Sequence, residues 1–209
     1  MRNYQKELEK IIEENQKNGI VPSLLLHSCC APCSSYVLEY LSQFFKITIF
    51  YYNPNIYPEQ EFFFRQQEQQ DLISRMQCKH PVEFLTAQFN PDEFYSSVKG
   101  LEHLGEKSER CHACYRLRLE KTASIANEKG FDFFTTTLSI SPMKDSHKLC
   151  EIGETLDTEG TKYLVSDFKK KNGYKRSVEI SREFEMYRQD YCGCVFSLKE
   201  KNERLKSQN

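Results

Sequence analysis

The chain has 209 residues, of which 39% are hydrophobic and 28% are charged. This length suits one domain with a sizeable core, and the apolar share excludes a disordered chain. The formal net charge of −1 gives no overall basic excess, so any nucleic-acid-binding patch has to be local. The longest apolar runs, such as 47–52, are far shorter than the roughly 20 residues of a membrane helix, and residues 1–10 do not resemble a signal peptide. We therefore expect a cytoplasmic protein without a membrane partner.

Helix and strand patterns alternate along the chain. Residues 1–20 predict a charged amphipathic helix, because apolar residues recur near helical spacing. Apolar, β-branched and aromatic runs then predict strands at 24–27, 46–52, 82–85 and 131–138. The segments between and after them predict helices at about 34–44, 58–76, 91–99, 112–129, 146–158 and 179–187. This alternation indicates a parallel sheet covered on both faces. We expect a single Rossmann-like α/β domain over residues 21–209, with the N-terminal helix as an appendage lying on it.

Three unusual loops follow predicted strands, at 27–33, 52–58 and 135–144. In open α/β sheets, ligands bind outside the carboxyl ends of the strands. The pattern therefore predicts that these loops contribute to one site.

The nine cysteines are the most informative feature of the composition. An odd number without a secretion signal argues against a disulfide framework and favours metal or redox chemistry. We expect the two solitary cysteines, Cys78 and Cys150, to be small buried apolar residues. The others fall in clusters: Cys29, Cys30, Cys33, Cys111, Cys114, Cys192 and Cys194.

Two segments carry cysteine pairs that suit one metal centre. Cys111 and Cys114 lie on one face at the start of a predicted helix, where the free amide groups and the dipole favour thiolates. Cys29 and Cys30 stand at a strand-to-helix turn, where both can face one centre. Four thiolates suit an iron–sulfur cluster or zinc; we favour iron–sulfur, but a zinc knuckle formed by Cys30 and Cys33 stays open. Neighbouring donors that we expect to support the site rather than ligate a metal are His27, Cys33 and His112.

The Cys192-Gly193-Cys194 segment predicts different chemistry. Gly193 allows the backbone distortion that a disulfide between these cysteines requires. A strained disulfide is easily reduced, which is typical of a redox pair in the cytosol. The alternatives are two metal ligands or two unpaired thiols.

Six motifs, in order, resemble those of the cobalamin-independent epoxyqueuosine reductases. They are HSCCAPC at 27–33, YNPNIYP at 52–58, ERCHACYRLR at 109–118, TTTLSISP at 135–142, DFKK at 167–170 and YCGC at 191–194. The resemblance implies an oxidoreductase that reduces epoxyqueuosine to queuosine in the anticodon of a tRNA, with loss of water and with electrons from an unidentified donor. It also implies a 4Fe-4S cluster, an additional iron without assigned ligands, and a redox-active disulfide between Cys192 and Cys194. The implied cluster ligands are Cys29, Cys30, Cys111 and Cys114.

A tRNA substrate needs cations for its phosphates and surfaces for an unstacked base. The segment 169–176 contains five basic residues and no acidic one, although a solvated turn would look the same. We predict nucleic-acid contacts at Lys169, Lys170, Lys171, Lys175 and Arg176. Positive charge near the cysteine helix comes from Arg110, Arg116 and Arg118. Aromatic candidates for contact with the base are the loop 51–57 and Tyr191.

Two alternative functions are an ATP-pyrophosphatase-like tRNA-modifying enzyme and a zinc-binding RNA module. The first class carries a glycine-rich phosphate loop after its first strand, whereas residues 27–32 contain no glycine. The second would give a colourless zinc protein instead of a brown iron–sulfur protein.

Overall fold

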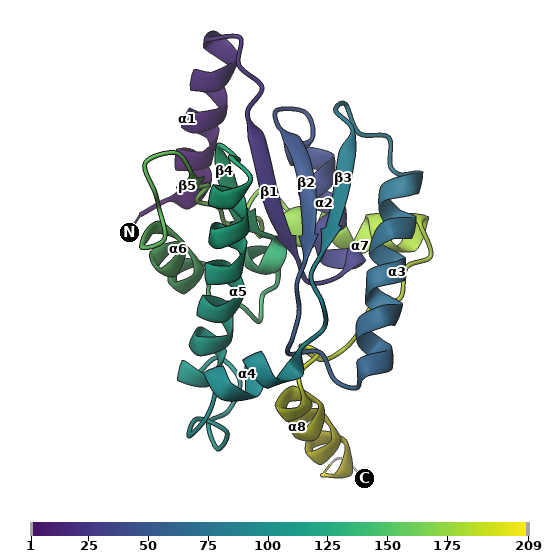
Figure 1. Ribbon diagram of the computed structural model, residues 1–209. Coiled ribbons are helices and arrows are strands. Elements are labelled where there is room, and N and C mark those ends of the chain that lie inside the picture. Colours follow the sequence, from purple (N-terminus) through teal and green to yellow (C-terminus); the bar gives the residue numbers. More distant parts are fainter. Residues whose placement is uncertain (1, 208–209) are drawn as a thin grey trace.

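The fold is built on a five-stranded parallel sheet with the strand order β3-β2-β1-β4-β5 (Figure 1). The computed structural model describes residues 2–207, so residue 1 of the predicted helix and residues 208–209 of the predicted domain lie outside it. This architecture confirms the expected Rossmann-like fold. The strands are β1 (Ser23–Ser28), β2 (Lys46–Tyr51), β3 (Val82–Thr86), β4 (Phe133–Thr136) and β5 (Lys162–Tyr163).

Helices cover both faces of the sheet. They are α1 (Tyr4–Lys17), α2 (Ala31–Leu41), α3 (Glu59–Arg75), α4 (Pro91–Ser97), α5 (Glu109–Glu128), the short 3-10 helix η1 (Thr137–Ile140), α6 (Ser146–Glu154), α7 (Gly173–Glu183) and α8 (Val195–Lys206). One buried cluster joins the sheet to α2 and α3, and another joins its opposite face to α5 and α6. Between residues 2 and 207, no helix combines the length and apolar composition needed to cross a membrane.

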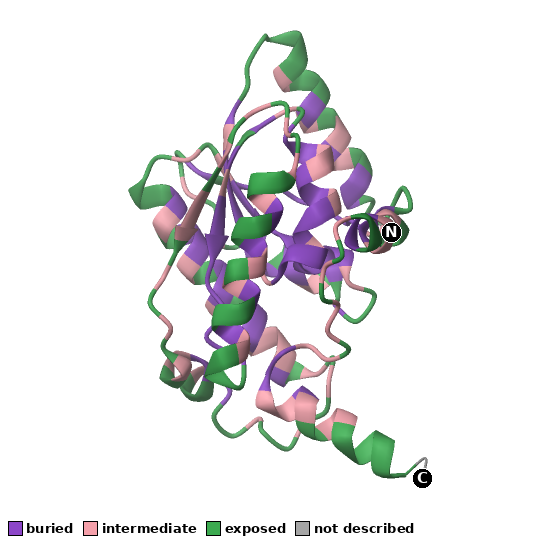
Figure 2. Ribbon diagram, turned by 90° about the vertical axis from the view of Figure 1, so that its right-hand side faces the viewer, coloured by how far each residue is buried: buried purple, intermediate pink, exposed green. Residues whose placement is uncertain are grey.

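The two cores follow from the alternation of side chains along the strands. Leu24 and Leu26 of β1 pack in the cluster with α2, whereas Leu25 packs in the cluster with α5 and α6. All three are fully buried, and the sheet forms the buried centre of Figure 2. The predicted N-terminal helix is present as α1, and it buries Leu8 and Ile12 in the first of these clusters.

The C-terminal third departs most from the sequence pattern. The predicted strand at 131–138 ends at Thr136, where the chain turns into η1. Helix α7 begins at Gly173 rather than at residue 179, inside the basic segment. Neither β5 nor α8 was predicted, because β5 has only two residues and α8 lacks an apolar stripe, with Ser197 as its one buried residue.

Candidate active site

A cavity of about 360 Å³ lies at the carboxyl ends of β1 and β4. These strands are neighbours, but the α-helices that follow them, α2 and α6, pack on opposite faces of the sheet, which makes this the point where the strand order reverses. The cavity is lined from the predicted loops 27–33 and 135–144 and from residues 188–192. The loop 52–58 supports this wall, because the Asn53 side-chain amide donates to the Ser28 carbonyl oxygen at 2.8 Å. Two of the three predicted loops therefore line one cavity, and the third contacts its wall.

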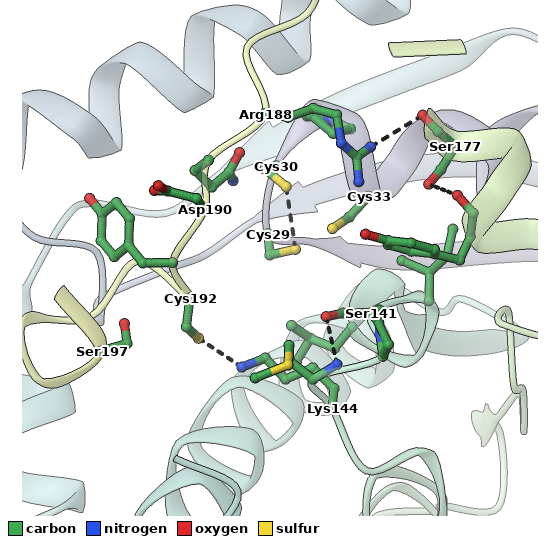
Figure 3. A pocket seen from close by; sticks show the side chains of 18 of the residues that line it. Cys29, Cys30, Cys33, Ser141, Lys144, Ser177, Arg188, Asp190, Cys192 and Ser197 are labelled. Carbon is green, nitrogen blue, oxygen red and sulfur yellow. Dashed lines mark hydrogen bonds between the residues drawn. The ribbon is translucent and has the colours of Figure 1, made fainter. Parts of the chain in front are cut away.

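Three cysteine sulfurs gather on one wall of the cavity (Figure 3). The Sγ atoms of Cys29, Cys30 and Cys33 all lie within 4.8 Å of one another, and those of Cys29 and Cys30 are 3.8 Å apart. Extended backbone at Cys30 precedes α2, and Cys33 lies in the first turn of that helix. This turn brings all three thiols to one point, which gives a donor set suited to a thiolate-bound metal.

The three thiols share negative charge unequally. Hydrogen bonds from Cys30 and Cys33, in that order of effect, hold the pKa of Cys29 well below its usual value. The hydrogen bond to Cys29 raises the pKa of Cys30 to about 12, and it also raises the pKa of Cys33. Metal binding would therefore release protons from this group.

The predicted ligands Cys111 and Cys114 lie in the first two turns of α5. Cys111 is half-buried and packs against the same apolar cluster as Cys29. Cys114 is buried in a small cluster that also contains Cys194. Among the described residues, neither sulfur belongs to the close group around Cys29.

Arg118 is buried one turn beyond Cys114 and connects the cysteine segments electrostatically. Burial lowers the pKa of Arg118, but the charges of Cys114, Cys192 and Cys29 outweigh that effect and raise it. Its Nη1 donates to Asn53 Oδ1 at 3.2 Å. The sequence marked this residue only as positive charge near the cysteine helix.

The cavity wall also contains nitrogen donors without partners in the described part of the chain. They are Nε and Nη2 of Arg118 and Nη2 of Arg65, and both side chains line the cavity. Arg65 is 1% exposed, and its Nε donates to Glu61 at 2.7 Å. Buried donors of this kind fit a negatively charged group in the cavity. No sequence pattern pointed to Arg65, which lies inside an ordinary helix.

The Cys192-Gly193-Cys194 segment runs from the cavity wall to the start of α8. Cys192 lines the cavity, and Lys144 Nζ donates to its Sγ at 2.8 Å (Figure 3). Cys194 is buried at the N-terminus of α8, where its Sγ accepts from the Ser197 amide at 3.4 Å. Neither cysteine is part of a disulfide here. No residue pattern singled out Lys144, although it falls in a predicted site loop.

Three of the predicted RNA contacts form ion pairs within the fold, and two of these three are lysines. Lys169 Nζ lies 3.1 Å from Asp167 Oδ1 and donates to the Ser139 carbonyl oxygen at 2.9 Å. Lys171 pairs with Glu9 of α1. Both lysines therefore also have a role inside the fold.

The remaining basic residues of this segment differ in their surroundings. Arg176 binds Glu39 and Glu183, each at 2.7 Å. Lys170 and Lys175 are exposed and form no ion pair within residues 2–207. The free positive charge of the segment is thus concentrated on these two lysines.

The other arginines of α5 serve local contacts. Arg110 is buried, donates to Glu200 Oε1 at 2.8 Å and stacks over Phe196, which attaches α8. Arg116 is exposed, 3.6 Å from Glu120. Neither lines the cavity.

The aromatic candidates separate by exposure. Tyr51 is fully buried and Tyr52 is 3% exposed, so neither presents a ring face to a base. Tyr57 is 45% exposed, and Tyr191 lines the cavity. These two rings are the accessible ones.

The histidines make contacts that suit support of the site. His27 is fully buried; its Nε2 contacts the Tyr52 carbonyl oxygen at 3.0 Å and its Nδ1 contacts Thr136 Oγ1 at 2.8 Å. Burial lowers the pKa of His27 to about 3, so the ring is neutral. His112 is partly buried, with Nδ1 3.2 Å from Glu109.

The expectation for the solitary cysteines is confirmed for one of them. Cys150 is fully buried, with its Sγ donating to the Ser166 carbonyl oxygen at 3.5 Å. Cys78 is only half-buried, because it follows the end of α3 in a surface loop, so that prediction was wrong.

Thiols on two sides of one cavity, at the reversal point of a parallel sheet, place this protein among Rossmann-like proteins with thiol-based metal or redox chemistry. A family model described as "Epoxyqueuosine reductase QueH" matches residues 24–200. The chain belongs to this family, which confirms the resemblance seen in the motifs. The ATP-pyrophosphatase-like and zinc-module alternatives are therefore set aside.

Curated relatives agree over most of the chain. The chain is 44% identical to epoxyqueuosine reductase QueH of Streptococcus pyogenes serotype M1, with 94% of this chain and 78% of that protein covered. It is 41% identical to the protein of the same name from Staphylococcus epidermidis, with 93% and 84% covered. For the Thermotoga maritima protein of that name the identity is 34%, with 87% and 93% covered.

Proposed function

We propose that this protein reduces epoxyqueuosine to queuosine in the anticodon of a tRNA. The observation that carries the proposal is the meeting of the Cys29, Cys30 and Cys33 thiols with the Cys192 thiol around one cavity. Family membership supplies the substrate class.

The chemistry requires two electrons and two protons. The epoxide oxygen leaves as water, and a carbon–carbon double bond forms. A dithiol that closes to a disulfide releases two electrons and two protons, so Cys192 and Cys194 meet this demand once per turnover. An electron donor of unassigned identity then has to reduce the disulfide.

Cys29, Cys30, Cys111 and Cys114 are the proposed ligands of a 4Fe-4S cluster. The close approach of the Cys29 and Cys30 sulfurs supports two of these ligands, and the unpartnered nitrogens of Arg118 and Arg65 suit the negative charge of a thiolate-bound cluster. Cys111 and Cys114 lie outside the close group of sulfurs and are assigned from the motif at 109–118. When bound, such a cluster supplies one-electron transfer at low potential. The proposal includes an additional iron, to which no residues are assigned.

The chain's own groups would shape the substrate site. Tyr57 and Tyr191 are the accessible rings for an unstacked base, and Lys170 and Lys175 are the free cations for phosphates. Lys169, Lys171 and Arg176 stay in the proposed contact segment, in competition with their internal carboxylate partners. A tRNA substrate and free thiols both fit the cytoplasm.

The test is anaerobic conversion of tRNA that carries epoxyqueuosine, with a chemical reductant. Nucleosides released from the product by nuclease digestion should contain queuosine, one oxygen atom lighter than the substrate. Metal content and visible absorbance are measured on the same sample, and Cys78→Ser, outside the cavity, is the matched control. A colourless zinc protein, or a metal-loaded protein that leaves epoxyqueuosine unchanged, would refute the proposal.

A further inference from the structure

Lys144 is a buried lysine whose ammonium group faces a thiol. Its side chain is 6% exposed, and Nζ lies 2.8 Å from Cys192 Sγ and 3.5 Å from Glu106 Oε1. A buried ammonium group is costly unless a negative charge compensates it. Cys192 provides the shorter of these two contacts, which makes its sulfur the closer partner for the charge.

The two cysteines of the pair have opposite surroundings. Cys192 opens into the cavity and contacts the lysine, whereas Cys194 is buried and its Sγ lies 3.5 Å from Ser197 Oγ. A nearby lysine favours thiolate, whereas an apolar environment favours thiol. Cys194 packs with Phe94 and Val98, which provide no charge.

We infer that Lys144 is a positioning residue that keeps Cys192 as the thiolate of the redox pair and leaves the proton on Cys194. The inference rests on the proposed function for the redox role of the pair. The charge state of Cys192 can be measured without turnover.

The groups around the pair support the same assignment of thiolate to Cys192 and thiol to Cys194. The hydrogen bond from Cys194 is the largest effect that lowers the pKa of Cys192, and the charge of Lys144 adds to it against burial. The hydrogen bond to Cys192 raises the pKa of Cys194. Other titratable groups that face the Lys144–Cys192 contact are Glu106, Tyr115, Arg118 and Cys114.

With Cys192 as thiolate and Cys194 as thiol, the electrons and protons of the reaction balance. When the Cys192 thiolate and the Cys194 thiol form a disulfide, two electrons and one proton are released. The ammonium group of Lys144 then faces a neutral sulfur and can release the second proton. The departing oxygen takes up both electrons and both protons as water, so the Lys144–Cys192 pair carries no net charge before or after the step.

The test is the rate at which iodoacetamide alkylates Cys192 in the reduced, anaerobically purified protein. The rate is measured from about pH 6 to about pH 9, which spans the ordinary cysteine pKa of about 8.5. Tandem mass spectrometry assigns the modification to Cys192 or Cys194. For the wild type, we expect a nearly constant rate at Cys192 and little reaction at Cys194.

Variants separate charge from structure. Lys144→Met should make Cys192 about tenfold slower to react at neutral pH and give it the rising profile of an ordinary thiol. Lys144→Arg retains the cation and should keep the flat profile. Lys148→Met is the matched control, because Lys148 is a partly exposed lysine 3.3 Å from Glu151 on α6.

Two results would overturn the inference: an ordinary rising profile for Cys192 in the wild type, or a wild-type profile in folded Lys144→Met. Either result alongside continued queuosine formation would leave the proposed function intact. A flat, lysine-dependent profile in a protein that makes no queuosine would instead refute the proposed function and leave the inference about the Cys192 thiolate standing.

Discussion

The amide of Tyr57 donates a hydrogen bond to the carbonyl oxygen of Gly193, with 2.8 Å between nitrogen and oxygen. The Tyr191 hydroxyl donates to the Tyr57 carbonyl oxygen at 3.0 Å. These contacts attach the cysteine pair to the loop that leaves β2. The position of Cys192 over the cavity therefore depends on that loop as well as on α8.

Gly193 should be intolerant of a side chain. Its φ is +110°, and an added Cβ would lie 2.9 Å from Arg65 Nη1. Gly193→Ala should lower the free energy of unfolding by roughly 1–3 kcal/mol, as expected for a strained backbone position. It should also lower turnover several-fold by displacing Cys192. Denaturant unfolding and queuosine formation measure the two effects.

Gly160→Ala is the matched control for this variant. Gly160 is exposed, has no positive φ, and an added Cβ would meet nothing within 4 Å. Its free energy of unfolding should change by no more than about 0.5 kcal/mol. If Gly193→Ala were as stable and as active as Gly160→Ala, the backbone conformation of Gly193 would not be what positions the Cys192-Gly193-Cys194 segment.

Four of the five strands could be predicted from local pattern, because apolar, β-branched and aromatic runs mark them. Val82–Thr86 is an example, since it begins where expected and is one residue longer than the predicted 82–85. Helix α8 could not, because it attaches through Arg110 to Glu200 and Phe196 rather than through an apolar stripe. Contacts between distant charged residues leave no periodic trace in a sequence.

The site was predictable where cysteines and the loops after strands mark it. Motif spacing led to Cys29 and Cys192, which both line the cavity. Arg65 and Lys144 were missed because arginine and lysine are usually exposed. Whether a single charged side chain is buried in a site depends on tertiary contacts, which the local sequence does not show. Cys33 was expected to be secondary, yet its sulfur joins the close group.

The ligand assignment predicts the effect of removing single cysteines. Cys29→Ala, Cys30→Ala, Cys111→Ala and Cys114→Ala should each lose most iron and visible absorbance, because four thiolates are needed to hold the cluster. Anaerobic purification followed by iron and sulfide analysis checks this.

Cys33→Ala distinguishes the proposed ligand set from the alternative set that contains Cys33. If Cys33 only supports the site, the variant should keep its iron and visible absorbance. Loss of the cluster in Cys33→Ala with full retention in Cys111→Ala would replace the proposed set by one that contains the close group of Cys29, Cys30 and Cys33.

The free lysines of the basic segment should affect tRNA binding. Lys170→Gln combined with Lys175→Gln should weaken binding and lower the slope of log K against log salt by about 0.7–0.9 for each phosphate that the variant no longer neutralises. Binding is measured at several salt concentrations. Lys46→Gln is the control, since Lys46 is exposed at the start of β2, at the end of the sheet opposite the cavity. If the double variant has the same slope as the wild type, the two lysines do not contact phosphates and the segment is a solvated turn.

The cysteine pair should be separable from the metal site. Cys192→Ser and Cys194→Ser should each retain iron and visible absorbance, because four other cysteines are the proposed ligands. Each should lose most multiple-turnover activity, since a serine cannot form the disulfide. Thiol trapping with mass spectrometry should find the wild-type pair oxidised in air and free after mild reduction, with Cys78→Ser behaving like the wild type. If either serine variant loses the cluster, the pair are metal ligands, and the division between metal-binding and redox cysteines is wrong.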